Sequence, residues 1–185
     1  FLSTLPPSIY VVGIAISTIF AAKIMSIVGR RLGFVLASIG SSLSCLIAAY
    51  AISIQNFILF SIACFILGSG MAFIHQYRFA AAESVDKDKA PKAISIILLG
   101  GIVSAGIGPG FANYAKNFVS DHLYAGSYLA LAVLTFIPSI LFLFYSNTSK
   151  IELKIKYSGR SYLQLISQPR YLQAIVASAF GYAIM

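Results

Sequence analysis

The stretch that decides the fold class is AISIILLGGIVSAGIGPGFANYA at residues 93–115, which contains no Asp, Glu, Lys or Arg. A helix that crosses the hydrocarbon core of a bilayer needs about 20 mostly apolar residues, and this stretch supplies that length. Similar stretches recur along the chain at residues 7–28, 32–53, 57–77 and 125–145, with a shorter one at 171–185.

These apolar stretches are predicted to be helices. Lipid offers no hydrogen-bond partners, so a spanning segment satisfies its own backbone as a helix or joins a closed barrel. None of the stretches alternates apolar and polar residues with the period of two that a barrel strand requires. The sequence therefore predicts an all-α transmembrane bundle with about five complete spans and a truncated sixth.

The composition supports a membrane protein. Of the 185 residues, 59% are hydrophobic and 10% are charged, whereas soluble domains average roughly 45–50% and about 25%. The net charge of +8 would suggest nucleic acid as a partner in a soluble chain, but the charges here lie in short clusters between apolar stretches. A soluble enzyme, a disordered tail and a nucleic-acid-binding module are therefore excluded.

The positive charges are divided unevenly between the connections. Twelve of the 13 Lys and Arg residues lie in residues 23–31, 78–92 and 146–170, and the other two connections hold one between them. Connections rich in Lys and Arg remain in the cytoplasm, so the first span is predicted to run from outside to inside. By composition, the long connection at 146–170 is either a surface-lying amphipathic linker or a linker between two helical bundles.

No residue pattern indicates catalysis, a metal site or a cofactor site. Cys45 and Cys64 lie inside apolar stretches without metal-ligand spacing, and no hydrolase, metalloprotease or phosphate-loop motif is present. His75, followed by Gln76 and Tyr77, lies near the end of the third apolar stretch. It is either a substrate or proton contact, together with those two neighbours, or an interfacial residue.

Small residues gather where helices are expected to touch, because helices in lipid associate mainly through close packing. The first span carries Gly13, Ser17 and Ala21 at a spacing of four, the third carries Gly68 and Gly70, and the fourth carries Gly101, Gly106, Gly108, Pro109 and Gly110. Pro109 removes a backbone donor, which predicts a kink or local unwinding. These residues serve either tight helix packing or a point at which a helix flexes.

Residues 22–31, AKIMSIVGRR, resemble the loop between the second and third helices of the major facilitator superfamily. The family pattern is Gly-x-x-x-Asp-(Arg/Lys)-x-Gly-Arg-(Arg/Lys), and Gly29, Arg30 and Arg31 match it. Ala22 replaces the first Gly, and Ser26 stands where the family has Asp. The resemblance implies a cytoplasmic loop that latches the two halves of the fold, built differently or more weakly here because serine carries no charge.

Two more stretches occur in the order that the family predicts. Residues 102–110 resemble the Gly-Pro motif of the fifth helix, and residues 68–72 resemble the glycine end of the fourth-helix motif. Cys64 stands at the position of that motif's arginine, which is associated with proton coupling in drug-efflux members. This substitution favours uptake over efflux.

The register of these motifs divides the chain. Residues 1–145 are expected to hold helices two to six of an N-terminal bundle, residues 146–170 the cytoplasmic linker between bundles, and residues 171–185 the start of helix seven. The chain is therefore expected to be a fragment of a longer membrane protein, whose remaining part is its partner in function.

Residues 76–83, QYRFAAAE, resemble a group of bacterial permeases, some of which are linked to riboflavin uptake. Arg78 and Glu83 are expected where the third span meets the cytoplasm. They form either a solvated pair that contributes little stability or, with Arg30 or Arg31, a gate contact that breaks when the inner side opens.

The resemblance implies a secondary active transporter of the bacterial inner membrane that moves a small solute by alternating access, without enzymatic activity and without a cofactor. The predicted cytoplasmic gate comprises Ala22, Ser26, Gly29, Arg30, Arg31, Arg78 and Glu83. Uptake of a metabolite or vitamin, riboflavin among them, competes with drug-type efflux, and a non-transporting scaffold or receptor on the same fold is a further alternative. No Asp or Glu lies inside a span, so a carboxylate that carries a coupling proton is expected in the rest of the protein.

Overall fold

The structure is a computed structural model of the chain and describes residues 2–119, residues 122–145 and scattered positions between 167 and 180. By its contacts the chain divides into two units, Phe1–Ser149 and Lys150–Met185. The predicted linker and the predicted sixth span fall largely outside the described residues, so both stay predictions. All the helices named below belong to the first unit.

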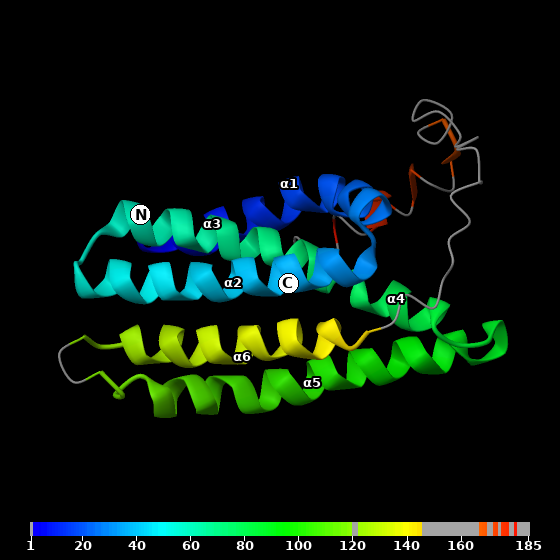
Figure 1. Cartoon of the computed structure of the whole chain (residues 1–185). Coiled ribbons are helices and arrows are strands. Elements are labelled where there is room, and N and C mark those ends of the chain that lie inside the picture. Colours follow the sequence, from blue (N-terminus) through cyan, green and yellow to red (C-terminus); the bar gives the residue numbers. More distant parts are fainter. Residues whose placement is uncertain are drawn as a thin grey trace. The chain divides into compact units, whose positions relative to one another are not determined.

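The described part of the first unit is built from helices (Figure 1). They are α1 (Leu5–Val28), α2 (Arg30–Ser53), α3 (Phe57–Ile74), α4 (Tyr77–Glu83), α5 (Ala90–Ala115) and α6 (Ala125–Leu143), with short 3-10 turns at Leu2–Thr4 and Lys87–Lys89. Five segments of this part are long and apolar enough to cross a membrane, and the third of them continues through α4 to Glu83. The all-α fold class and the five predicted spans are thereby confirmed. The third helix, predicted to continue to residue 77, ends instead at Ile74, before a short turn.

Local sequence signals set the helix boundaries. Gly29 alone separates α1 from α2, with a φ angle of 88° that glycine adopts without the steric cost of a side chain. At the start of α3 the Asn56 side chain accepts a hydrogen bond of 3.0 Å from the Leu59 N–H, which would otherwise lack a partner. Prolines stand in the first turn of α1 and of α5, where a missing N–H costs no helical hydrogen bond.

Helix α2 lies at the centre of the unit (Figure 1). It packs against α3 and α6, while α1 packs chiefly against α3, and α5 packs against α4 and α6. Two buried serines of α2 hydrogen-bond across these contacts. Ser42 Oγ donates to the Ala132 carbonyl of α6 at 2.9 Å, and Ser44 Oγ donates to the Ala63 carbonyl of α3 at 2.5 Å. Such bonds and close backbone approach hold helices together where lipid removes the hydrophobic driving force.

The glycines of α1 and α3 lie in a close helix contact. A methyl group added at Gly13 would overlap the backbone of Phe65, and one added at Gly68 would overlap the backbone of Tyr10. The two helices therefore touch backbone to backbone, which larger residues at these positions would prevent. Gly70 makes similar room on α3 for a serine side chain of α2.

The glycines of α5 have no such neighbours. A methyl group at Gly100, Gly101, Gly106, Gly108 or Gly110 would meet no atom of the described residues within 4 Å. The helix also continues without interruption through Pro109, so the local unwinding that the sequence predicted there is absent. Within the described part of the chain, this glycine-rich face of α5 is uncovered.

Candidate functional site

Two features at opposite ends of the helices could serve function. The first, the basic end, is formed where α1, α3 and α6 end and where α2 and α5 begin. The second is a cavity formed at the other ends of the same helices. The gate residues predicted from the sequence lie at the basic end, and few of the residues that line the cavity were predicted.

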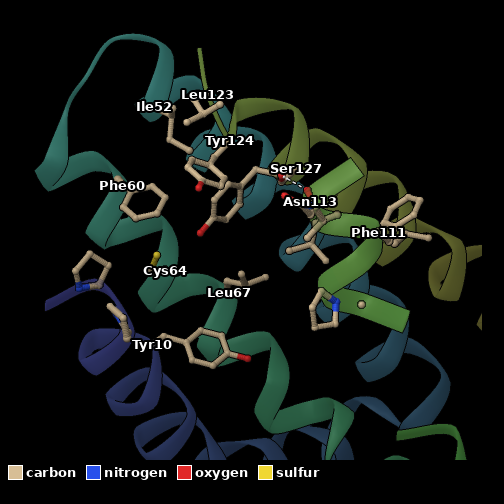
Figure 2. A pocket seen from close by; sticks show the side chains of 18 of the residues that line it. Tyr10, Ile52, Phe60, Cys64, Leu67, Phe111, Asn113, Leu123, Tyr124 and Ser127 are labelled. Atoms are coloured by element: carbon tan, nitrogen blue, oxygen red, sulfur yellow. Dashed lines mark hydrogen bonds between the residues drawn. The ribbon is translucent and has the colours of Figure 1, made fainter. Parts of the chain in front are cut away.

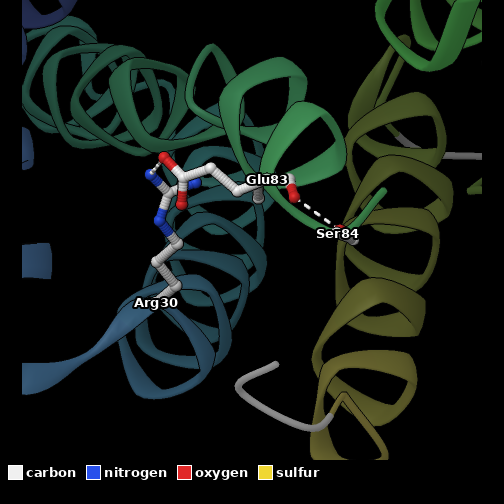
Figure 3. A network of polar contacts seen from close by, with 4 residues as sticks. Arg30, Glu83 and Ser84 are labelled. Carbon is white, nitrogen blue, oxygen red and sulfur yellow. Dashed lines mark hydrogen bonds and ion pairs between the residues drawn. The ribbon is translucent and has the colours of Figure 1, made fainter. Parts of the chain in front are cut away.

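An ion pair joins two helices at the basic end. Arg30, the first residue of α2, donates from Nη2 to Glu83 Oε1 at 2.5 Å, and Glu83 is the last residue of α4 (Figure 3). The Arg30 side chain is 18% exposed and that of Glu83 is 45% exposed, so the pair is partly shielded from solvent. Arg30 Nη1 is buried and has no hydrogen-bond partner among the described residues.

The second arginine of the loop binds another helix. Arg31 Nη2 donates to the Leu143 carbonyl at the end of α6. Because free carbonyls at a helix C-terminus carry partial negative charge, a cation is favourable there. The two consecutive arginines thus link the start of α2 to α4 and to α6.

Three aromatic rings pack together at this same end. Phe34 is fully buried and lies with its ring centroid 4.8 Å from Tyr77 and 4.9 Å from Phe142, and those two rings lie 5.0 Å apart. Edge-on and tilted contacts of this kind are favourable for aromatic pairs. The rings pack together between α2, α4 and α6. Tyr77 and Phe142 also line a smaller cavity of about 430 Å³.

The other predicted gate residues make local contacts. Ser26 Oγ donates to the Lys23 carbonyl one turn earlier at 2.7 Å, and Ala22 is exposed on the same helix. Arg78 does not pair with Glu83, and its guanidinium instead lies 5.0 Å from the centroid of the Phe79 ring. Glu83 was expected to pair either with Arg78 or with one of the loop arginines. In the structure it pairs with Arg30.

The cavity at the opposite end has a volume of about 980 Å³. Its lining residues come from the first turns of α1, from α2, α3 and α5, and from the start of α6. They are Ser3, Pro6, Pro7, Tyr10, Ile52, Phe60, Cys64, Leu67, Gly108, Pro109, Phe111, Ala112, Asn113, Leu123, Tyr124, Ser127, Tyr128, Leu131 and Leu134. No Asp, Glu, Lys, Arg or His is among them, so the described wall of the cavity is uncharged.

Aromatic rings and neutral polar groups share this wall. Figure 2 shows Tyr10, Phe60 and Tyr124 around the same opening, each on a different element. The Phe60 and Tyr128 rings meet edge to face with centroids 5.5 Å apart. Ser127 Oγ donates to the Ala112 carbonyl at 2.7 Å, which ties the start of α6 to the end of α5. Such a wall can stack on a flat ring and hydrogen-bond to uncharged polar groups.

From this wall the sequence singled out only Gly108 and Pro109, as packing or hinge residues, and Cys64, as the residue at the position of a motif's arginine. The available signal was the presence of Tyr10 and Tyr128 inside apolar stretches, where a phenol hydroxyl needs a polar partner or an open space. His75 and Gln76, the proposed substrate contacts, instead lie in the turn between α3 and α4 and do not line this cavity.

Comparison with known proteins places the chain in a family. The sequence model of the Major Facilitator Superfamily matches residues 2–185. The riboflavin transporter RfnT of Brucella anthropi is 31% identical over 186 residues, an alignment that covers all of this chain and 47% of that relative. The chain thus spans about half the length of this curated relative. No solved structure matches the chain significantly. The family match over nearly every residue, with five spanning helices and the arginine loop between α1 and α2, means that the chain belongs to the Major Facilitator Superfamily.

Proposed function

We propose that the full-length protein containing this chain is a secondary active transporter that takes up a small, uncharged aromatic solute by alternating access. The observation that carries the proposal is the uncharged, aromatic-walled cavity, which lies within the spanning bundle of a member of this family. Its volume falls in the range of about 300–1,000 Å³ that is common for small-molecule sites. We propose no enzymatic activity and no cofactor.

Riboflavin is the solute that we propose. The relative from Brucella anthropi carries the name riboflavin transporter and aligns with the whole of this chain. Riboflavin combines a planar ring system with a hydroxylated side chain and bears no charge near neutral pH. The aromatic side chains of the cavity wall suit the first part, and neutral polar groups such as Asn113 suit the second.

We propose that the basic end faces the cytoplasm of a bacterial cell and that the protein lies in the inner membrane. Seven of the 13 Lys and Arg residues lie in the two described connections at this end, residues 23–31 and 78–92, and connections rich in these residues remain in the cytoplasm. The cavity then lies toward the outer side, where a solute that is to be taken up would arrive. Drug-type efflux has no specific observation in its favour.

We further propose that the basic end is the inner gate. The Arg30–Glu83 pair, the bond from Arg31 to α6 and the rings around Phe34 close this end together. Opening toward the cytoplasm requires these contacts to separate, which alternating access achieves by tilting one group of helices against another. A coupling proton would be carried by a group in the rest of the protein.

The test uses the full-length protein in a bacterial strain that cannot synthesise riboflavin. Growth and uptake of labelled riboflavin are measured at limiting vitamin, with and without a proton uncoupler. Rescue of growth with saturable uptake is the expected result, and sensitivity to the uncoupler would indicate proton coupling. Absence of uptake despite confirmed membrane insertion would remove riboflavin as the solute.

A further inference from the structure

We infer that Tyr124 determines the specificity of the cavity by stacking its ring on a planar aromatic solute. The inference rests on the proposed function, in which such a solute enters the cavity. Tyr124 lies at the mouth of the cavity, directly before α6, and lines it from the connection between α5 and α6 (Figure 2).

The backbone of Tyr124 adopts an unusual conformation. Its φ angle is 72° and its ψ angle is −12°, in the left-handed region that bulky residues rarely occupy. Glycine or asparagine would adopt this conformation at lower cost, and both are common at such positions. A strained backbone at a residue that lines a cavity points to a role for its side chain.

The surrounding contacts hold this conformation in place. The Tyr124 carbonyl accepts hydrogen bonds from the Ser127 and Tyr128 N–H groups at 3.1 and 3.4 Å, which begin α6. A methyl group at Gly126 would overlap the Ala115 carbonyl, so the first turn of α6 lies directly against the end of α5. Together with the bond from Ser127 to Ala112, these contacts hold the backbone of Tyr124 in place at the start of α6.

The ring itself is free to bind a solute. Tyr124 is 55% exposed, and among the described residues its ring contacts no other ring and its hydroxyl has no hydrogen-bond partner. Tyr128, by comparison, already places its ring edge to face against Phe60. Tyr124 therefore offers a ring face and a hydroxyl that no described neighbour uses, beside a wall that already contains aromatic side chains.

The test compares three variants of the full-length protein. Tyr124→Gly removes the ring and relieves the backbone, and Tyr124→Phe keeps the ring and removes the hydroxyl. Gln55→Gly is the matched control, because Gln55 also has a positive φ angle, 54°, but does not line the cavity. Binding of riboflavin, and of lumichrome as the ring system without the hydroxylated chain, is measured by flavin fluorescence quenching in detergent. Riboflavin uptake is measured in cells.

Tyr124→Gly is expected to raise the Kd for both probes and the KM for uptake by about 5- to 10-fold, the effect of losing one stacking ring. Tyr124→Phe should stay within about twofold, because the ring remains. Thermal stability should not fall in Tyr124→Gly or Gln55→Gly, since glycine relieves the strained backbone at both positions.

Each contrary outcome separates this inference from the proposed function. Uptake by every variant with unchanged Kd and KM overturns the role of Tyr124 and leaves the transporter intact. Binding that Tyr124→Gly weakens, in a protein without uptake, overturns the proposed function and supports the role of Tyr124. Failure of the folded wild-type protein to bind either probe overturns the inference, and the uptake assay then decides the function independently.

Discussion

The glycines of the described bundle have two different surroundings, one at the contact of α1 with α3 and the other along α5. At Gly13 and Gly68 the backbones of two helices touch, so each glycine has a facing partner that a side chain would displace. Along α5, at Gly101 and Gly106, the same residue type faces no described atom. A run of glycines in a membrane helix therefore predicts close packing only where a partner helix is also present.

The contrast extends to rigidity. α1, α2 and α3 are held by backbone contact and by the buried bond from Ser44 to the Ala63 carbonyl, so they form a packed region. Among the described residues α5 packs chiefly against α4 and α6, and its glycine-rich face is left uncovered by them. We propose that these glycines mark a point at which α5 flexes during transport.

The largest effect is expected when a larger side chain is introduced at the contact of α1 with α3. Gly68→Leu should destabilise the protein by about 3 kcal/mol or more, because the new side chain would overlap the backbone of Tyr10 and separate α1 from α3. The matched control is Gly106→Leu on α5. Thermal unfolding of both variants in detergent provides the measurement, and equal midpoints would show that the two glycines do not differ.

The second prediction concerns transport by that same control. Gly106→Leu should keep its stability yet reduce the rate of riboflavin uptake by about tenfold, because hinge positions affect the transport cycle more than the fold. Uptake is compared at equal amounts of inserted protein. Normal uptake by a stable Gly106→Leu variant would end the proposal that α5 needs its glycines to move.

The two cysteines sharpen the comparison within the packed region. Cys64 is 7% exposed and lines the cavity, whereas Cys45 is fully buried. In a full-length protein whose other cysteines are replaced by serine, a thiol reagent should modify Cys64 and spare Cys45. Saturating riboflavin should slow the modification about fivefold, as expected when a ligand covers most of its pocket. Labelling that persists in a Cys64→Ser variant would contradict this assignment.

The smallest expected effect is at the ion pair that connects the packed region to α4. Glu83→Gln should lower stability by less than about 1 kcal/mol, because the pair is partly exposed. It should change the uptake rate by about two- to threefold, since the proposed gate opens more easily. Arg78→Gln is the control, because Arg78 lies over Phe79 and not against Glu83. An equal effect of both variants would remove the special role of Glu83.

Much of the fold could be predicted from the sequence because length and hydropathy dictate spanning helices. The five predicted spans match α1, α2, α3, α5 and α6, with bounds that differ by a few residues. The end of helix α3 was placed late, because the apolar stretch to Tyr77 contains a turn at His75 that depends on backbone geometry. Of the kink or local unwinding predicted at Pro109, the unwinding is absent, since one lost hydrogen bond is tolerated in a spanning helix.

The candidate site could be predicted less well because its cavity is assembled from distant segments. Tyr10, Phe60, Asn113 and Tyr128 share no motif, and they come together only after α1, α3, α5 and α6 have packed. The basic end could be predicted better, because charged residues are rare in a membrane protein and often mark functional positions. Even there, the sequence could not show that Glu83 pairs with Arg30 and not with another arginine.

Helix α1 contacts α3 extensively and α2 only slightly. This difference affects the order in which the helices assemble during synthesis. A ribosome adds about 5–20 residues per second, and α2 emerges directly after α1 because only Gly29 separates them. α1 nevertheless finds its main partner only when Gly68 and the rest of α3 have been made. Helix α1 therefore waits several seconds for this partner, and slowing translation across α3 should prolong the exposure of α1 to degradation.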